Sequence, residues 1–512
     1  MNISYQKIQL NNFIKNMFAV LFKNRHELKI FITIYILGLL FISPQPQSMA
    51  LNMLDLTTSI IDRGDVCLDE HHAMDVSFYD SRYVSGNPPG ASFLAIPVYL
   101  LFHGLINLAE NPLYGLNVLC ILLITLPLTA TLGILLFRFY LKIGTSVSWA
   151  AFLSMAYTGT TMWMSYGTSF FKRSVAGFIL IYCFSELVFK TRNGEKSLFK
   201  WIWLGFVLGF TISVDYAAAP LVAIISIISF LHHRNLNPLK MVPGFVLSLA
   251  LLFRYHTAAY GSPLATSYTY RVAEEAVLSA SIQTFSPLQV LSDLFSLRGS
   301  LLTYYPIMIL GLIGAYFGFR RKDDHFWAWI CILACFLTTA LLWGMWAHAY
   351  LCERGVAQRI YLLIIPLCGV GLPYAFKNQF LKKFCWLFIV PGLIINYLTM
   401  QTGLMPSNTV QIVFAIKVFI TSLGVPSWLS EELVRALGIQ TIHTHVARPD
   451  VSFGSMLSMP SNEIMPLLGN SLITFGVWIV LLVVFFIMIK RLWHINLNRL
   501  VDFTKSDVFT KN

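Results

Sequence analysis

The stretch from Asp62 to Leu101, DRGDVCLDEHHAMDVSFYDSRYVSGNPPGASFLAIPVYLL, decides how the rest of the chain is interpreted. It contains six carboxylates, two His and two Arg before a Pro-Pro-Gly, and from Ala91 onward it is continuously apolar. Because charged residues make up only 12% of the chain, a cluster of this density has to lie in water or line a wet cavity. A charge cluster directly before an apolar helix is typical of a site for a substrate that is polar at one end and apolar at the other.

Composition predicts an all-α polytopic membrane protein, because hydrophobic residues form 56% of the 512 residues. No small-residue cleavage site follows the basic N-terminal segment, so we expect the first apolar run to be retained as a membrane helix. The net charge of +12 is more typical of loop lysines that face anionic lipid than of nucleic-acid binding. The lipid bilayer is therefore an expected partner, and nucleic acid is not.

Twelve apolar runs are long enough, with their flanking residues, to cross a membrane. They are Phe31–Phe41, Leu116–Phe137, Val147–Trp163, Val175–Phe189, Trp201–Val214, Ala217–Leu231, Met241–Phe253, Leu301–Phe319, Trp327–Trp346, Ile360–Phe376, Phe384–Met400 and Leu467–Ile489.

The distribution of Lys and Arg decides the role of a thirteenth apolar segment, Ala91–Leu108, which contains Pro97. If the N-terminus is cytoplasmic and this segment does not cross, the short cytoplasmic segments hold 24 of the 36 Lys and Arg residues, as the positive-inside rule requires. If the segment crosses, every later loop inverts and the basic run at 320–322 lies outside. We therefore expect about twelve transmembrane helices and a membrane-surface helix that follows a large first outer loop.

The same topology divides the chain into four regions and places the long polar segments on the outer face. Residues 1–30 are the predicted cytoplasmic N-terminus, and residues 31–400 form a transmembrane domain with its first outer loop at 43–111. Residues 401–466 form an outer loop region, and residues 467–512 form the last transmembrane helix and a cytoplasmic tail. The cytoplasmic turns are short and basic, so we expect the chemistry to lie outside.

Several short segments carry a resemblance to a known family. They are Asn87-Pro88-Pro89-Gly90, YGTSFFKR at 166–173, GFTISVDYAA at 209–218, YGSPLATSY at 260–268, FSLRGSLLTYYP at 295–306 and ERGVAQRIYLLIIP at 353–366. With these segments the chain resembles the GT-C superfamily of membrane glycosyltransferases, particularly bacterial relatives of protein mannosyltransferases and of the lipid A aminoarabinose transferase. Those proteins have a large first outer loop with carboxylates, followed by a Pro-containing motif that opens a membrane-surface helix. The resemblance covers most of the chain from Leu51 to Pro366.

The resemblance implies a GT-C-like fold and a glycosyltransferase that takes a sugar from a polyprenyl-phosphate-linked donor. The acceptor would be a glycan, a lipid or a protein on the outer side of the membrane. The resemblance also implies a multi-pass protein of the bacterial inner membrane whose active face is periplasmic, and a branch of the family that uses neither a metal nor a cofactor.

An inverting transfer needs a carboxylate that deprotonates the acceptor hydroxyl. The family places its acidic residue soon after the first span, where this chain has only Gln45 to Ala50. The candidate base is therefore Asp75, which lies in register with the motif, and Asp55 is its rival because it is nearer the first span. Asp80 is a third candidate.

The transfer also needs cations that hold the phosphate leaving group. The Lys that the family places before its Pro motif is Asn87 here, so the charge has to come from other outer-face residues. The candidates are Arg82, Arg354, Arg359, Lys172 and Arg173. Asp215 and Tyr216 complete the motif residues with Asn87, Pro88, Pro89 and Gly90.

Each of these residues also has a simpler interpretation. Asp75 and Asp80 are also explained as helix caps or solvated loop charges, and Arg82 as a surface partner of Asp80, a bond worth under about 1 kcal/mol. Asp215 is equally well explained as a cap of an outer turn. Lys172 and Arg173 are also explained as an anchor that snorkels from a helix end to water. The pair His71-His72 is a metal candidate, but adjacent His side chains point apart in regular structure, and we expect no metal.

Three other functions remain open. A transporter or flippase of a lipid-linked saccharide would carry polar groups near the middle of its spans, whereas the predicted spans here are almost free of charge at their centres. A polymerase or ligase of surface polysaccharide would be expected to have its largest polar loop later in the chain. A non-catalytic GT-C relative is consistent with the missing acidic residue at Met49-Ala50.

Overall fold

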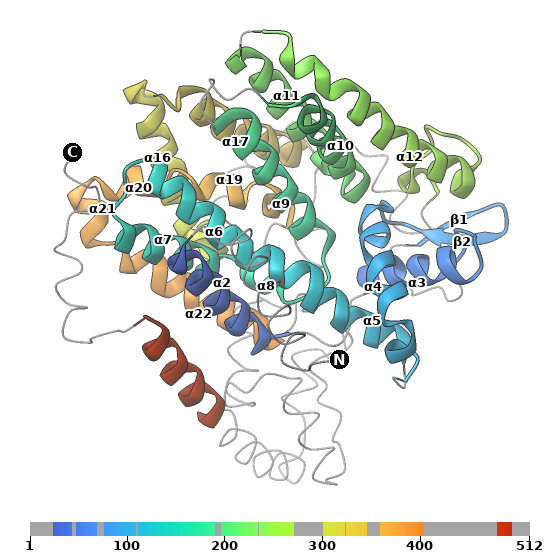
Figure 1. Ribbon diagram of the computed structural model, residues 1–512, viewed down its shortest axis with the longest axis horizontal. Coiled ribbons are helices and arrows are strands. Elements are labelled where there is room, and N and C mark those ends of the chain that lie inside the picture. Colours follow the sequence, from blue (N-terminus) through green and yellow to red (C-terminus); the bar gives the residue numbers. More distant parts are fainter. Residues whose placement is uncertain are drawn as a thin grey trace, which may run out of the picture.

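The computed structural model describes ten parts of the chain, and within them the fold is mostly helical, as predicted (Figure 1). The described residues are 24–42, 48–68, 76–108, 111–189, 196–233, 235–270, 301–322, 324–345, 359–402 and 479–493. Asp75, Arg354 and the pair His71-His72 lie outside these ranges, so the structure does not place them.

The first elements are α2 (Arg25–Leu39), α3 (Ser48–Asp62), β1 (Val76–Tyr79), β2 (Arg82–Ser85) and α4 (Gly90–Ile106). Strands β1 and β2 form an antiparallel hairpin, which corrects the prediction of an all-α chain. Its two-residue turn consists of Asp80 and Ser81, at φ 50° and 59°. Positive φ at both central residues matches the right-handed twist of paired strands. The hairpin places Phe78 and Tyr83 on an exposed face and buries Ser77 and Val84.

Among the described residues, three helices are long and apolar enough to cross a membrane. The first spans Pro112–Lys142 and consists of α5 (Pro112–Cys120), the π-helical turn η1 (Ile121–Thr125) and α6 (Leu126–Lys142). The second spans Tyr216–His233, from η3 (Tyr216–Ala218) through α11 (Ala219–His233). The third spans Asn237–Tyr260 and joins η4 (Asn237–Met241) to α12 (Val242–Tyr260).

Further helices complete the described fold. They are α7 (Val147–Thr160), α8 (Met162–Gly167), α9 (Lys172–Phe184), η2 (Ser185–Phe189), α10 (Leu198–Val214), η5 (Ser267–Thr269), α15 (Leu301–Tyr304), α16 (Pro306–Arg321), α17 (Phe326–Met345), η6 (Arg359–Leu363), α19 (Ile365–Gly369), α20 (Leu372–Phe376), α21 (Gln379–Lys383) and α22 (Trp386–Thr402). A final helix occupies 479–493.

Several predicted spans are therefore not continuous helices. The run 147–163 breaks at Thr161, and the run 301–319 breaks at Tyr305 before Pro306. The run 360–376 consists of three short helical pieces, η6, α19 and α20. Pro366 and Pro373 sit in the first turns of α19 and α20, where a proline starts a helix well but cannot continue the preceding one.

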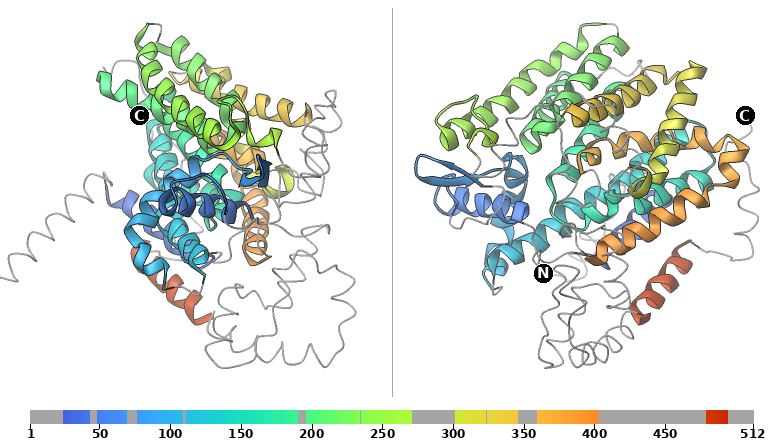
Figure 2. Two further views of the ribbon diagram at one scale, coloured as in Figure 1. Left: turned by 90° about the vertical axis from the view of Figure 1, so that its right-hand side faces the viewer. Right: turned by 180° about the vertical axis from the view of Figure 1, so that it is seen from behind.

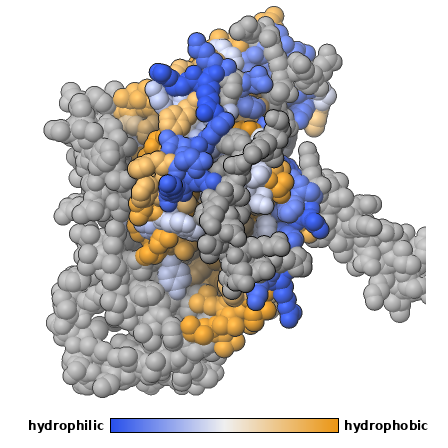
Figure 3. Space-filling model, turned by 90° about the vertical axis from the view of Figure 1, so that its left-hand side faces the viewer, coloured by the Kyte–Doolittle hydropathy of each residue, from blue (hydrophilic) through white to orange (hydrophobic). Residues whose placement is uncertain are grey.

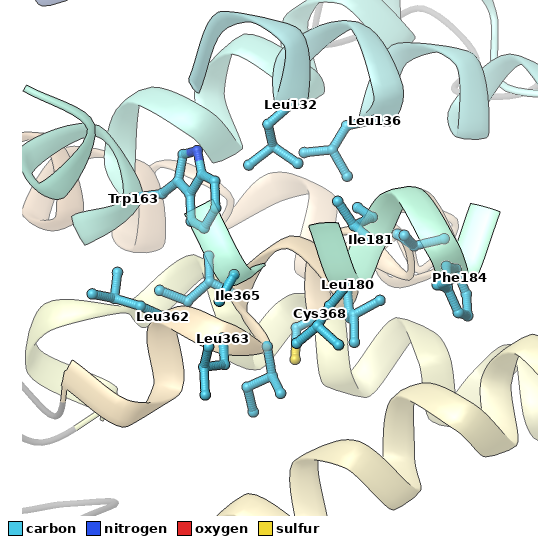
Figure 4. Packing of buried hydrophobic residues seen from close by; sticks show 14 of the residues in the cluster. Leu132, Leu136, Trp163, Leu180, Ile181, Phe184, Leu362, Leu363, Ile365 and Cys368 are labelled. Atoms are coloured by element: carbon cyan, nitrogen blue, oxygen red, sulfur yellow. The ribbon is translucent and has the colours of Figure 1, made fainter. Parts of the chain in front are cut away.

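The main core joins helices that lie far apart in the sequence (Figure 4). This core includes Leu132 and Leu136 of α6, Leu180 of α9, and Ile365 and Cys368 of α19. All five side chains are fully buried. In this core the irregular segment η6–α19 is covered by apolar side chains from helices on more than one side, which allows its broken backbone to lie inside a helical bundle.

Two glycines bring α10 and α12 into direct backbone contact. A Cβ added to Gly205 would overlap the carbonyl of Met241, and one added to Gly244 would overlap that of Ile202. Small residues at such crossings let helix backbones approach closely in membrane proteins. This contact sets α10 and α12 side by side, so that their C-terminal ends, Val214 and Tyr260, reach the same side of the molecule as the hairpin (Figures 1 and 2).

The two ends of the bundle differ in their charged contacts. At the end away from the hairpin, basic side chains lie over aromatic rings: Lys142 over Phe189 at 5.7 Å and Arg321 over Tyr374 at 5.5 Å. On the face opposite the hairpin, hydrophilic residues gather beside hydrophobic ones (Figure 3). The hairpin, α3 and α4 lie together at the other end, beside the end of α12 (Figure 2).

Candidate functional site

Two adjacent cations open helix α9, the first of them buried and the second mostly buried. Lys172 is 2% exposed, and the side chain of Arg173 is 16% exposed. The N-terminus of a helix is already positive because of its free N–H groups and the helix dipole, so cations are unfavourable there. The preceding residue, Phe171, supplies no capping side chain. Because the Lys172 side chain does not reach water, simple snorkelling does not explain it.

Lys172 is held by Asn87, the first residue of the Asn-Pro-Pro-Gly run. Its Nζ donates to Oδ1 of Asn87 at 2.7 Å, and Asn87 is completely buried. The backbone N–H of Asn87 donates to Ser85 Oγ at 3.2 Å, which orients the turn between β2 and α4. The side-chain nitrogen of Asn87 is buried and has no hydrogen-bond partner within the part of the chain that the structure describes. A buried N–H donor of this kind is costly unless something accepts from it.

Arg173 is held by a carboxylate from the α10–η3 turn. Its Nε donates to Oδ2 of Asp215 at 2.9 Å, and Asp215 is fully buried. The backbone N–H of Ala217 donates to Oδ1 at 3.1 Å. Burial raises the pKa of Asp215, but Arg173, Lys172 and the hydrogen bonds lower it more, so the net pKa is below the ordinary value. Asp215 is therefore an ionised partner of Arg173 at neutral pH and is not a proton carrier.

The Pro-Pro-Gly run joins these two turns. Pro89 is the N-cap of α4, and Gly90 lies against the end of α10. A Cβ at Gly90 would lie 2.6 Å from backbone atoms of Ser213 and Val214, so this close approach requires glycine. The hydroxyl of Ser213 is buried without a hydrogen-bond partner among the described residues. We use the name α9 cation site for Lys172, Arg173, Asn87 and Asp215.

A third cation, Arg359, lies beside the α9 cation site at the start of η6. Helix α9 packs directly on η6, since a Cβ at Gly177 would lie 2.7 Å from the carbonyl oxygen of Leu362. Burial raises the pKa of Tyr166, and the opposing charges of Arg359 and Arg173 lower it by less, so both guanidinium groups act electrostatically on this phenol. The same two arginines interact electrostatically with Tyr305.

Tyr305 adds a further buried donor to this region. Its side chain is fully buried, and its hydroxyl has no hydrogen-bond partner in the ranges that the structure covers. It lies at the break between α15 and α16. The α9 cation site and its surroundings thus combine three cations with several buried donors, a composition that suits a ligand rich in acceptor oxygens such as a phosphate.

Of the predicted phosphate ligands in the described ranges, Arg82 lies elsewhere. Arg82 is on the exposed side of the hairpin and pairs with Asp80 at 3.6 Å, with side chains 45% and 75% exposed. These exposures match the simpler interpretation of Arg82 and Asp80 as a surface pair. The structure therefore brings together Lys172, Arg173 and Arg359, and it leaves Arg82 apart.

Among the predicted bases, only Asp55 and Asp80 lie in described parts of the chain. Asp55 is 2% exposed, and Ser59 Oγ lies 3.5 Å from its Oδ1. Its helix, α3, lies against the start of α4, where the carbonyl oxygen of Ser92 is 3.1 Å from Thr57 Oγ1. Asp55 is thus a buried carboxylate on a helix that contacts the helix following Asn87.

Tyr216 is engaged with a histidine that sequence analysis did not select. Its hydroxyl lies 2.7 Å from Nε2 of His256. Sequence analysis also missed Ser85, Tyr260 and Tyr305. Tyr260 and Tyr305 lie in segments quoted for the family resemblance, whereas no pattern in the sequence singles out His256.

The described residues contain no group of three or more His, Cys, Asp or Glu arranged to hold a metal ion. Comparison with known proteins adds no identification: no family model matches the chain, and no curated protein matches it significantly. The function therefore has to be inferred from the geometry of the site.

Proposed function

We propose that this chain is a membrane glycosyltransferase of the GT-C type, and that the α9 cation site holds the phosphate of a polyprenyl-phosphate-linked sugar donor. The observation that supports this most is the burial of Lys172 and Arg173 at a helix N-terminus. This placement is unfavourable for cations alone and favourable once an anion is bound. The unpartnered nitrogen of Asn87 and hydroxyl of Tyr305 are the neutral donors expected around a phosphate.

In the proposed reaction the acceptor hydroxyl attacks the anomeric carbon of the sugar. The bond from that carbon to the phosphate oxygen breaks, and polyprenyl phosphate leaves with the bonding electrons. A carboxylate takes the proton of the hydroxyl, and the cations stabilise the charge that develops on the phosphate. Asp75 remains the first candidate for the base and Asp55 the second, since Asp55 lies on α3 next to the start of α4.

The proposed orientation has about twelve crossings, with both termini in the cytoplasm and the α9 cation site at the periplasmic surface of a bacterial inner membrane. The contacts of Lys142 and Arg321 at the opposite end of the bundle support it, because basic residues favour the cytoplasmic side. Helix α4 is proposed to lie in the outer leaflet. Its second half exposes Leu100, Leu101 and Leu105 at 57%, 78% and 57%, and Pro97 and a kink at Phe102 interrupt it.

Binding of the lipid phosphate tests the site directly. The full chain in detergent is titrated with polyprenyl phosphate and, separately, with the uncharged polyprenol, and the thermal unfolding midpoint is measured. We expect Lys172→Gln and Arg173→Gln to weaken the apparent affinity for polyprenyl phosphate about 10- to 100-fold, the loss of one charge-assisted hydrogen bond, and to leave polyprenol unaffected. The matched control Arg82→Gln should behave like the wild type. Weakening by Arg82→Gln alone would move the phosphate to the hairpin.

The base is tested by transfer. A general base contributes about 10²- to 10⁴-fold to the rate, so Asp75→Asn should lose that much turnover of a polyprenyl-phosphate-linked sugar. Full turnover by Asp75→Asn together with loss in Asp55→Asn would assign the base to Asp55. Binding of polyprenyl phosphate without transfer of any polyprenyl-linked sugar would support a non-catalytic relative or a flippase instead.

A further inference from the structure

The last turn of α12 carries two buried polar rings on one face. His256 and Tyr260 are four residues apart, so they project from the same side of the helix. They are 3% and 1% exposed. Helix α12 ends at Tyr260, and Gly261 caps it at φ +71°, in the left-handed conformation that glycine favours. Each of the two rings is connected through hydrogen bonds and one loop to one of the two adjacent cations, Arg173 and Lys172.

The first connection runs from His256 to Arg173. His256 Nδ1 lies 3.0 Å from the carbonyl oxygen of Pro263, which only accepts, so Nδ1 carries the hydrogen. In the neutral ring Nε2 is then an acceptor, and it receives the hydroxyl of Tyr216 at 2.7 Å. Tyr216 directly follows Asp215. The hydrogen bond therefore fixes the turn whose carboxylate binds Arg173.

The second connection runs from Tyr260 to Lys172. The Tyr260 hydroxyl donates to the carbonyl oxygen of Ser85 at 2.9 Å. Ser85 Oγ in turn accepts from the backbone N–H of Asn87, whose side-chain oxygen binds Lys172. A single helical turn thus holds both of the loops that bind the adjacent cations, although Asn87 and Lys172 are 85 residues apart in the chain.

The segment 260–268 holds this turn of α12 in place. Pro263 orients the His256 ring, the carbonyl of Ser267 accepts from Ser77 Oγ of the hairpin at 2.9 Å, and the ring of Tyr268 packs edge-on against Tyr216 at 5.9 Å. These contacts explain why the YGSPLATSY run accompanies the site, since each is made by a residue of that run.

We infer that His256 and Tyr260 are positioning residues of the α9 cation site: acting through Tyr216 and Ser85, they set the distance and orientation of Arg173 and Lys172 toward a bound phosphate. The inference rests on the proposed phosphate ligand. Neither residue contacts the ligand itself. Two cations can hold one phosphate from two directions only if both side chains are fixed. The loops of Asn87 and Asp215 fix them, and both loops are hydrogen-bonded to the last turn of α12.

The test compares single-hydroxyl deletions in the full chain in detergent. Tyr216→Phe and Tyr260→Phe each remove one hydrogen bond and keep the ring. The matched control is Tyr35→Phe in α2, away from the site. It removes the hydrogen bond of 3.1 Å that the Tyr35 hydroxyl donates to the carbonyl oxygen of Leu122. Apparent affinity is measured for polyprenyl phosphate and for polyprenol by the shift of the thermal unfolding midpoint.

We expect Tyr216→Phe and Tyr260→Phe each to weaken the affinity for polyprenyl phosphate about 2- to 10-fold, the value of one neutral hydrogen bond, with polyprenol and Tyr35→Phe unchanged. His256→Gln, which keeps an acceptor and a donor, should recover part of the loss seen in His256→Leu. The double variant Tyr216→Phe with His256→Gln should lose no more affinity than the single variant with the larger loss, because both changes act on one hydrogen bond. In the double variant Tyr216→Phe with Tyr260→Phe, the two fold-losses of affinity should multiply, because the bonds are separate.

If Tyr216→Phe and Tyr260→Phe bind polyprenyl phosphate with the same affinity as Tyr35→Phe, the positioning role is overturned, while the proposed phosphate site stands. Equal losses for polyprenol and polyprenyl phosphate would also overturn it, because they would indicate general loosening of the fold. If the wild type itself shows no preference for polyprenyl phosphate over polyprenol, the proposed function fails, and the positioning role fails with it.

Discussion

The ion pair between Arg173 and Asp215 should be one of the strongest polar contacts of the described chain, and Asp215→Asn tests it. Asp215 is fully buried and the Arg173 side chain is 16% exposed. At a separation of 2.9 Å and an effective dielectric constant of about 20, the attraction is about 6 kcal/mol before desolvation. Removing one partner of such a pair leaves a mostly buried charge beside Lys172, which typically costs about 3 kcal/mol.

The surface pair of the hairpin is the matched control. Arg82 and Asp80 lie 3.6 Å apart and are 45% and 75% exposed, so Asp80→Asn should cost under about 1 kcal/mol. Double-mutant cycles on the free energy of unfolding of the full chain in detergent at pH 7 give both coupling energies. We expect at least about 2 kcal/mol for Arg173 with Asp215 and under about 1 kcal/mol for the surface pair. A coupling no larger than that of the surface pair would refute the reasoning from burial.

Three further predictions follow from the same geometry. Because the pKa of Asp215 is lowered from 3.8, its contribution to stability is complete above about pH 4 and is lost only as the pH falls through the lower folded-state pKa. The difference in unfolding free energy between wild type and Asp215→Asn should therefore be constant from pH 5 to 8 and should close in stronger acid. A difference that closes near pH 6 would contradict the lowered pKa. Gly90→Ala should destabilise the chain by about 1–3 kcal/mol, because its Cβ would overlap the backbone of Ser213 and Val214; Gly104→Ala in the same helix, which meets nothing within 4 Å, should be neutral or slightly stabilising. Cysteines introduced at Asn111 and at Asn193 should differ in intact cells, with only Asn111 labelled by an impermeant reagent, and the reverse result would overturn the orientation inferred from charge.

The positions of most helices could be predicted from apolar runs, because a membrane segment must satisfy its own backbone and helices do so. Runs of this kind do not show where a helix breaks. The breaks at Thr161 and Tyr305 fall inside runs that are apolar enough overall to be predicted as single spans. The first break lies in the short run Thr158-Gly159-Thr160-Thr161, and Pro306 marks the second. The hairpin escaped prediction because Asp80-Ser81 is a less usual pair than Asn-Gly for a turn that needs two positive φ values. The alternation of apolar and polar residues in its two strands extends over only a few residues.

The site was harder to predict than the fold. Asp215, Tyr216 and Asn87 were selected from local motifs, and the structure does bring all three to the start of α9. Their partners could not be deduced, since the pairing of Asn87 with Lys172 depends on how two distant turns pack. Lys172 was interpreted first as an anchor because the sequence shows that it is basic and near a helix end, but not that it is buried. His256 has no local pattern at all, and its role comes only from the contacts of Tyr216 and Pro263.

Keeping the α9 cation site in an apolar bundle is costly, and this cost supports the proposed function. Replacing a buried ion pair by apolar residues of similar size is often neutral or stabilising, so stability alone gives no reason to keep Lys172, Arg173 and Asp215 in an apolar bundle. Their location adds a second cost, because the dipole of α9 opposes both cations. A bound anion removes both costs together: it is attracted by the cations and by the helix N-terminus, and it accepts from donors such as the side-chain nitrogen of Asn87. The proposed lipid-linked donor supplies such an anion, because it carries a phosphate on an apolar tail that lies within the membrane.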